Sequence, residues 1–188
     1  MKELSLNILD IAQNSLTAGS SLVEILLDET DDALRITVRD NGCGMSAEMV
    51  ERVTDPFCTS RKTRKVGLGI PFFKLAAEQT GGCLELESVP EDLSPDRHGT
   101  VISGLFYKQH LDFTPLGDVV STVCTLIQGC GDVNIVYRHS LPGGEVEMDT
   151  RELRAMLGDI PLSEPEILVW IRGNLTEQYR EAAQDSMK

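Results

Sequence analysis

The spacing of apolar residues near the start of the chain predicts a helix with one buried stripe. Over residues 3–16 the apolar positions recur at intervals of three and four, and Gly19 is expected to end the helix. Two β-type runs follow at residues 22–27 and 34–38, separated by a polar turn. We expect them to pair as a hairpin whose second strand ends at Asp40.

After the hairpin the pattern alternates between helix and strand signals. Ser46 can cap a short helix, Pro56 and its polar neighbours indicate a loop, and Gly81 follows a second helical stretch. The expected elements are a helix, a loop, a helix and two strands, at residues 46–53, 55–65, 68–80, 83–88 and 100–107. This order predicts a two-layer α/β (α+β) sandwich with an antiparallel or mixed sheet.

A different pattern begins near residue 110 and indicates a small α+β module. Its expected elements are a helix, a hairpin, a helix, a strand and a closing helix, at residues 116–128, 133–148, 150–157, 167–171 and 175–183. We therefore divide the chain into residues 1–108 and residues 109–188. The second unit carries no motif that we can attach to chemistry, and its size suggests that it packs on the first unit or on a partner.

Charge narrows the classes of partner. The net charge is −13, so a nucleic-acid backbone and an anionic lipid surface are poor partners. One short basic cluster, residues 61–65, suits a single polyanionic ligand. The sequence shows no secretory signal and no apolar run long enough to span a membrane, so we expect a cytoplasmic protein. Its 41% of apolar residues is an ordinary globular composition.

The cysteines show neither a paired spacing nor a metal-binding spacing with histidine. We expect reduced thiols that pack as small apolar groups, although two of them fall inside the candidate site and could be sensitive to oxidation. They are Cys43, Cys58, Cys83, Cys124 and Cys130.

Two glycine-rich segments carry the candidate chemistry. Residues 40–45 read Asp-Asn-Gly-Cys-Gly-Met, and residues 67–69 read Gly-Leu-Gly at the start of a predicted helix. Glycines let the backbone approach a ligand closely, and the free N–H groups at a helix start bind phosphate. Each segment alone is weak evidence, because the first is also a plain turn or a partial calcium loop.

Taken in order, these segments resemble a known family. Residues 10–19 and 40–45 closely resemble the first two sequence motifs of the GHKL ATPases, and their residues are most similar to those of the MutL-type mismatch-repair proteins. Later segments resemble the ATP-binding domain of sensor histidine kinases, at residues 55–61, 67–70, 78–82 and 99–100. The resemblance covers residues 4–107 and implies the Bergerat fold, with ATP and magnesium as ligands.

The resemblance implies a role for several residues of the first unit. Asn14 would hold Mg²⁺ against the triphosphate, whereas a lone asparagine in a helix is more often solvated. Asp10 would be the general base for an attacking water, although close relatives usually carry glutamate there. Asp40 would accept the exocyclic amine of adenine, supported by Thr100. The residues expected to surround the base are Gly42, Gly44 and Met45.

The resemblance also assigns the phosphate-binding groups. Gly67, Leu68 and Gly69 would meet the phosphates at the start of a helix. Arg61 could reach the γ-phosphate, and so could Lys62, Arg64 or Lys65, although a solvated loop is an equal alternative for each. Lys65 stands where the histidine kinases usually have a further glycine.

The implied activity is that of a kinase-like ATPase that hydrolyses ATP or transfers its γ-phosphate to a separate partner protein. None of His98, His110 and His139 resembles a phosphoacceptor histidine, so we expect structural or surface roles for all three. The alternative is an interaction module switched by nucleotide without useful turnover. A MutL-like clamp is disfavoured by the acidic charge, and a homodimer is left open.

Overall fold

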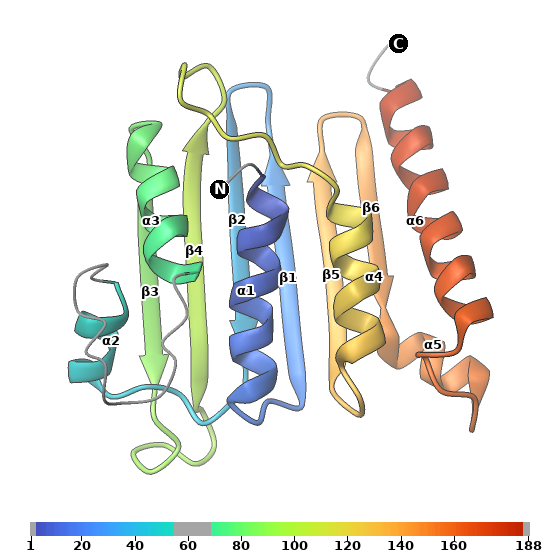
Figure 1. The fold of residues 1–188 in the computed structure, drawn as a ribbon, viewed down its shortest axis with the longest axis horizontal. Helices are drawn as coiled ribbons and strands as arrows, with labels where there is room; N and C mark the ends of the chain where they lie inside the picture. The colour runs from blue at the N-terminus through green and yellow to red at the C-terminus, as the bar shows by residue number, and fades with distance from the viewer. Residues whose placement is uncertain (1–2, 55–68, 186–188) are drawn as a thin grey trace.

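A six-stranded mixed sheet frames the molecule in the computed structural model, which describes residues 3–54 and 69–185 (Figure 1). The strand order is β3-β4-β2-β1-β5-β6, in which β1 and β5 run parallel and every other neighbouring pair runs antiparallel. The strands are β1 (Leu22–Glu29), β2 (Ala33–Asp40), β3 (Cys83–Val89), β4 (Gly99–Tyr107), β5 (Asn134–Leu141) and β6 (Gly144–Asp149).

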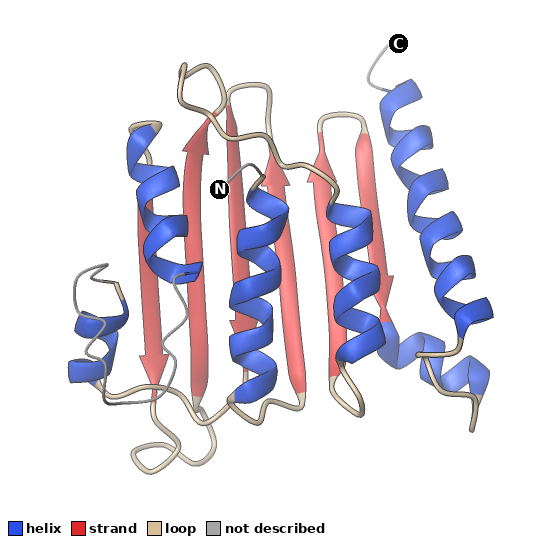
Figure 2. Cartoon of the chain, viewed as in Figure 1, coloured by secondary structure: helices blue, strands red, loops and turns tan. Residues whose placement is uncertain are grey.

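Four helices lie side by side on one face of this sheet (Figure 2). They are α1 (Leu4–Thr17), α3 (Gly69–Gln79), α4 (Val119–Gly129) and α6 (Pro165–Asp185). Two short helices lie outside this layer, α2 (Ala47–Val53) and α5 (Thr150–Leu157). The predicted two-layer α/β sandwich is confirmed. Within the described ranges, no helix combines the length and the apolar character needed to cross a membrane.

Strict alternation along the central strands separates the two faces of the sheet. On β2, Leu34, Ile36 and Val38 are buried, whereas Arg35 and Arg39 alternate with them and point to the opposite face. There Arg39 forms an ion pair with Glu24 of the neighbouring β1 at 3.8 Å, and Arg35 reaches across β4 to Glu85 of β3 at 3.5 Å. The helix-covered face therefore holds the apolar core, and the other face is polar and open.

The C-terminal segment extends the same sheet. Strand β5 pairs with β1 in parallel, and the start of α1 is tied to the segment before α4 by the Leu4 N–H, which donates to Pro115 O at 2.9 Å. The division predicted at residue 108 falls in the connection between β4 and α4. Strands from both sides of this division share one sheet. The division into two units stays a prediction.

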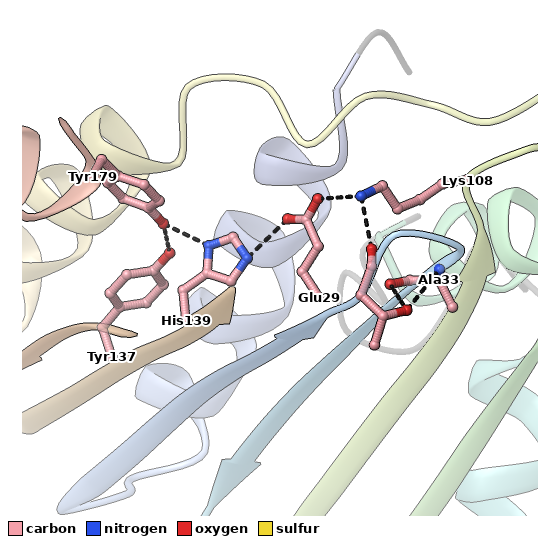
Figure 3. A network of polar contacts seen from close by, with 7 residues as sticks. Glu29, Ala33, Lys108, Tyr137, His139 and Tyr179 are labelled. Carbon is pink, nitrogen blue, oxygen red and sulfur yellow. Dashed lines mark hydrogen bonds and ion pairs between the residues drawn. The ribbon is translucent and has the colours of Figure 1, made fainter. Parts of the chain in front are cut away.

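A chain of polar side chains crosses the junction between these segments (Figure 3). Glu29 at the end of β1 accepts from Lys108 Nζ at 2.7 Å and from His139 Nε2 on β5 at 3.0 Å. The other ring nitrogen of His139 lies 2.7 Å from the hydroxyl of Tyr179 on α6, which also bonds the hydroxyl of Tyr137. One consistent set of donors runs along this chain: the Tyr137 hydroxyl donates to Tyr179, the Tyr179 hydroxyl donates to His139 Nδ1, and His139 Nε2 donates to Glu29.

Burial and neighbouring groups shift the pKa values of Glu29 and the two tyrosines, and so set their charges. The hydrogen bond from His139 and the neighbouring Lys108 lower the pKa of Glu29 to about 2, although burial opposes them. Burial raises the pKa of Tyr179 to about 12 and raises that of Tyr137 as well. Glu29 is therefore a carboxylate and both tyrosines are neutral donors over the physiological range of pH. We call these five residues the Glu29 network.

The strand predicted at residues 167–171 is wrong. This segment belongs to α6, which runs without a break from Pro165 and includes the helix expected at residues 175–183. Apolar residues at 167, 171 and 175 recur every four positions and face the core, with Ile171 and Leu175 fully buried. The exposed Trp170 and Val169 between them make the short run resemble a strand.

Gly173 offers a direct test of the α6 assignment. A Cβ added at Gly173 would have no heavy atom within 4 Å, so Gly173→Ala is expected to stabilise the protein by about 1 kcal/mol through helix propensity alone. Gly158 is the matched control, because it is equally open but has φ 61° and ψ −118°. We expect Gly158→Ala to destabilise by about 1–2 kcal/mol. Urea unfolding measures both, and destabilisation by Gly173→Ala would contradict the helix.

Candidate functional site

The site is built around the carboxylate of Asp40, at the end of β2. Its Oδ2 accepts a hydrogen bond from Ser15 Oγ at 2.6 Å, and its Oδ1 accepts from the Gly42 N–H at 2.9 Å. Ser15 is buried in the last turns of α1, while Asp40 is half-buried. Each carboxylate oxygen keeps a further lone pair, so an oriented anionic acceptor is available at this point. Sequence reasoning assigned no role to Ser15.

The loop after Asp40 is tied to three other parts of the chain. The Cys43 N–H donates to Ala18 O at 3.0 Å, and Cys43 O accepts from the Glu91 N–H at 3.0 Å. The Met45 N–H donates to Ser88 Oγ at 2.8 Å. Backbone groups that are already paired cannot rearrange cheaply. The loop beside Asp40 is therefore held in one conformation.

The two glycines of this loop are required by packing within the protein. Gly44 has φ +67°, and a Cβ there would lie 2.0 Å from Val89 O. A Cβ on Gly42 would lie 2.9 Å from Ala18 Cβ and 3.1 Å from Asp40 Oδ1. Larger residues would push the loop away from β3 and from the end of α1. That the same glycines also let a ligand base approach stays a prediction.

Thr100 lies directly opposite Asp40 in the antiparallel pairing of β2 and β4. Its hydroxyl is 2.9 Å from Ser88 Oγ, the same oxygen that accepts from the Met45 N–H. Thr100 thus helps to fix the loop through Ser88. Support of Asp40 by the Thr100 hydroxyl stays a prediction.

Asp10 lies on α1 against the first residue of α3. A Cβ on Gly69 would come within 2.7 Å of Asp10 Cβ and 3.3 Å of Asp10 Oδ2, so only glycine lets the two helices approach this closely. The Asp10 carboxylate is open on its other side, and the partial burial raises its pKa. A carboxylate with a raised pKa is a stronger base.

Asn14 follows Asp10 by four residues and so lies on the same face of α1. Its side chain is exposed and makes no hydrogen bond to any residue that the structure describes. The structure therefore places Asp10 and Asn14 on one exposed face of α1. This face ends beside Ser15, whose hydroxyl donates to the Asp40 carboxylate.

Two contacts around this face were missed by sequence reasoning. Asn7 is buried on α1, where its amide nitrogen is 3.5 Å from Gly69 O and its Oδ1 has no partner among the described residues. His98 is half-buried, and its Nδ1 lies 2.6 Å from Gly42 O. Both contacts join residues more than 50 positions apart, so no local pattern signals them.

Five of the predicted ligand contacts fall outside the described residues. They belong to the basic loop and to the glycine turn before α3, and are Arg61, Lys62, Lys65, Gly67 and Leu68; the alternative candidate Arg64 lies there as well. Of the predicted phosphate-binding turn, Gly69 is described, and it is the first residue of α3, the helix predicted at residues 68–80.

A hollow of about 310 Å³ lies in the C-terminal segment, between the end of α4 and the connection from α5 to α6. Arg154, Asp132 and Asp159 line it together with apolar residues. All of its lining residues fall between positions 127 and 163, so it is separate from the Asp40 site.

Comparison with known proteins identifies the class. Residues 1–109 match the family described as histidine kinase-, DNA gyrase B- and HSP90-like ATPases. This match covers more than half of the 188 residues, so the chain belongs to that family. The predicted family resemblance is confirmed, and membership implies that the chain binds ATP.

Similar curated proteins are sensor and sporulation kinases. Sporulation kinase A of Bacillus subtilis is 29% identical over 91 residues, which is 48% of this chain and 15% of that protein. The C4-dicarboxylate transport sensor protein DctB of Rhizobium meliloti is 33% identical over 87 residues, 44% of this chain and 14% of that protein. The chain thus matches only about one seventh of the length of these relatives.

Solved structures agree on the fold. The Aquifex aeolicus MutL ATPase domain complexed with ADP superposes with a TM-score of 0.50 at 14% identity, covering 98% of this chain and 70% of that one. The N-terminal domain of a DNA repair protein gives a TM-score of 0.53 at 12% identity, covering 79% and 52%. Identities this low establish the fold alone.

Proposed function

We propose that this chain binds Mg²⁺-ATP between Asp40, the exposed face of α1 and the start of α3. We propose further that it hydrolyses the nucleotide or transfers its γ-phosphate to a separate regulatory partner protein. The observation that carries this proposal is the Asp40 carboxylate, held by Ser15 and Gly42 at the end of the helix face that bears Asp10 and Asn14. Family membership supports it.

Asp40 is suited to select adenine. Its two oxygens are already oriented by donors from the protein, so its remaining lone pairs are directed before a ligand arrives. The exocyclic amine of adenine donates to a carboxylate, whereas guanine presents an oxygen at the same position and would be repelled. Gly42, Gly44 and Met45 belong to the loop beside this acceptor and are its proposed neighbours.

The donor set fits magnesium bound through the nucleotide. Among the described residues, no group of three or more His, Cys, Asp or Glu side chains could hold a metal by itself. Magnesium commonly takes one or two protein oxygens and completes its shell with phosphates and water. The free amide of Asn14 can supply that oxygen. Bound magnesium would neutralise negative charge on the triphosphate.

The phosphates are proposed to lie at the start of α3. Gly69 opens this helix beside Asp10, and the free N–H groups of a first helical turn attract anions. Gly67 and Leu68 would contribute further N–H groups, and Arg61, Lys62, Arg64 or Lys65 would contribute charge, as the sequence predicts.

Asp10 is proposed as the base that deprotonates or orients the attacking water. Its raised pKa and its place against Gly69 favour this role. Aspartate reaches one methylene less far than the glutamate of close relatives. That difference supports the second candidate function, a nucleotide-switched interaction module that binds ATP without useful turnover.

Asp10→Asn separates the two candidates. Incubation of the protein with magnesium and γ-labelled ATP should release labelled phosphate, or label an added partner. We expect Asp10→Asn to lower the rate of phosphate release by about 100-fold or more while ATP affinity changes little, since a general base contributes at least this factor.

The matched control is Gln13→Ala, which alters an exposed neighbour on α1. Turnover in this control should equal that of the unmodified chain. Equal turnover in Asp10→Asn would show that Asp10 is not the base. Absence of any turnover, together with stabilisation by ATP in thermal unfolding, would leave the switched module as the function.

A further inference from the structure

His98 lies in the connection between β3 and β4 and contacts the loop that follows Asp40. Its Nδ1 is 2.6 Å from the carbonyl oxygen of Gly42. A carbonyl oxygen can only accept, so Nδ1 carries the hydrogen of this bond. The contact joins two loops that are 56 residues apart in the sequence.

The peptide groups of Gly42 connect His98 to Asp40 through one residue. The Gly42 N–H donates to Asp40 Oδ1 at 2.9 Å, and the Gly42 carbonyl accepts from His98. Gly42 has no side chain, so its backbone has more rotational freedom than any other residue would have. The peptide group that contains the Gly42 carbonyl is held on one side by the Cys43 N–H, which donates to Ala18 O at 3.0 Å, and on the other by His98. Together these two contacts limit the rotation of Gly42 that would move its N–H off the carboxylate.

The two residues that follow His98 pack closely against residues 40 and 41. Gly99 has φ +133°, and a Cβ there would lie 2.1 Å from Asp40 O and 3.0 Å from Asn41 Cα. Thr100 pairs with Asp40 across β2 and β4. Three consecutive residues of one segment thus hold three consecutive residues of the other, and His98 makes the side-chain contact of this set.

We propose that His98 is a positioning residue for base recognition, which acts by helping to fix the Gly42 backbone, whose N–H orients the Asp40 carboxylate. The inference rests on the proposed function, because it assumes that Asp40 accepts the amine of adenine. It assigns His98 an effect on the choice of base, beyond any effect on folding. Loss of the imidazole should leave the triphosphate contacts unchanged and loosen the contact with the 6-amino group.

The test compares ATP with purine riboside 5′-triphosphate, which lacks only the 6-amino group. The ratio of their dissociation constants measures the contact with Asp40, and Asp40→Ala should bring it to about one. His98→Ala is expected to lower the ratio about fivefold, as the loss of one hydrogen bond of about 1 kcal/mol implies. His98→Asn, whose amide can donate from nearly the same place as Nδ1, should restore it to within about twofold.

Leu93→Ala is the matched control, since Leu93 lies in the same connection and is 77% exposed. It should keep the ratio of the unmodified chain. A purely structural role for His98 would lower the melting temperature of His98→Ala and leave the ratio unchanged, and that result would overturn the inference.

The failure of the inference can be told apart from failure of the proposed function. If the unmodified chain binds both nucleotides and only Asp40→Ala abolishes the preference for ATP, base recognition stands and the role of His98 falls. If the unmodified chain binds neither nucleotide, or binds both equally well, the proposed function falls and the inference falls with it.

Discussion

Asp40→Asn is expected to weaken ATP binding by a factor on the order of 10 to 100. The substitution removes the negative charge proposed to accept the adenine amine, and a hydrogen bond to a charged group contributes about 1.5 to 3 kcal/mol. The new amide must also place its NH₂ near Ser15 Oγ or the Gly42 N–H, both of which donate to Asp40. Isothermal titration calorimetry with ATP and magnesium measures the change.

Asp31→Asn is the matched control for this experiment. Asp31 is exposed in the turn between β1 and β2, at the far end of the hairpin from Asp40, and the change in net charge is the same. Its ATP affinity should equal that of the unmodified chain. An unaltered dissociation constant for Asp40→Asn would show that the carboxylate does not contact the base.

Glu29→Gln is expected to lower the free energy of unfolding by about 3 kcal/mol at neutral pH. Since one pKa unit corresponds to about 1.4 kcal/mol, the shift of Glu29 from 4.5 to about 2 has this size. The side chain is 21% exposed, so solvent screens it little. Urea unfolding across a range of pH gives the measurement.

The pH dependence has a definite sign. The folded state lowers the pKa of Glu29, so the stability that the carboxylate contributes is complete above its unfolded value of 4.5. That stability is lost as the pH falls through 4.5 toward about 2, where Glu29 is protonated in the folded protein too. The difference in stability between the unmodified chain and Glu29→Gln should shrink over this interval.

Glu87→Gln is the control, because Glu87 lies exposed on β3 and has no ion-pair partner among the described residues. We expect a change below about 0.5 kcal/mol at every pH. A Glu29→Gln protein as stable as the unmodified chain at neutral pH would mean that the Glu29 network does not hold the C-terminal segment to the sheet.

Local pattern was enough to predict most elements of the fold. The helix at residues 3–16 and the hairpin after it have clear periods of 3.6 and 2, and the structure places α1, β1 and β2 there with small shifts at the ends. Ser46 caps α2 as expected, accepting from the Met49 N–H. These features depend on residues close together in the sequence, which is why the pattern reveals them.

Long-range contacts were beyond the reach of such reasoning. The parallel pairing of β1 with β5 joins segments more than 100 residues apart, and neither strand carries a signal for its partner. The contacts of Ser15 with Asp40 and of His98 with Gly42 are of the same kind. The error at residues 167–171 had another cause, because a run of five apolar or aromatic residues fits either a strand or a helix turn.

The Glu29 network gives the C-terminal segment a physical link to the family domain. Glu29 belongs to the strand next to β2, while His139 and Tyr179 come from β5 and α6. The network lies at the end of the sheet opposite Asp40, because β1 runs from the Asp40 end toward Glu29. Its loss should therefore affect folding more than nucleotide affinity.

A crystal structure of the chain with magnesium and a non-hydrolysable ATP analogue would test the central claim most directly. We expect the adenine amine within about 3 Å of an Asp40 oxygen, and the metal-bound phosphates beside Asn14 at the start of α3. A nucleotide bound elsewhere, such as in the hollow lined by Arg154, or an adenine without contact to Asp40, would contradict the account.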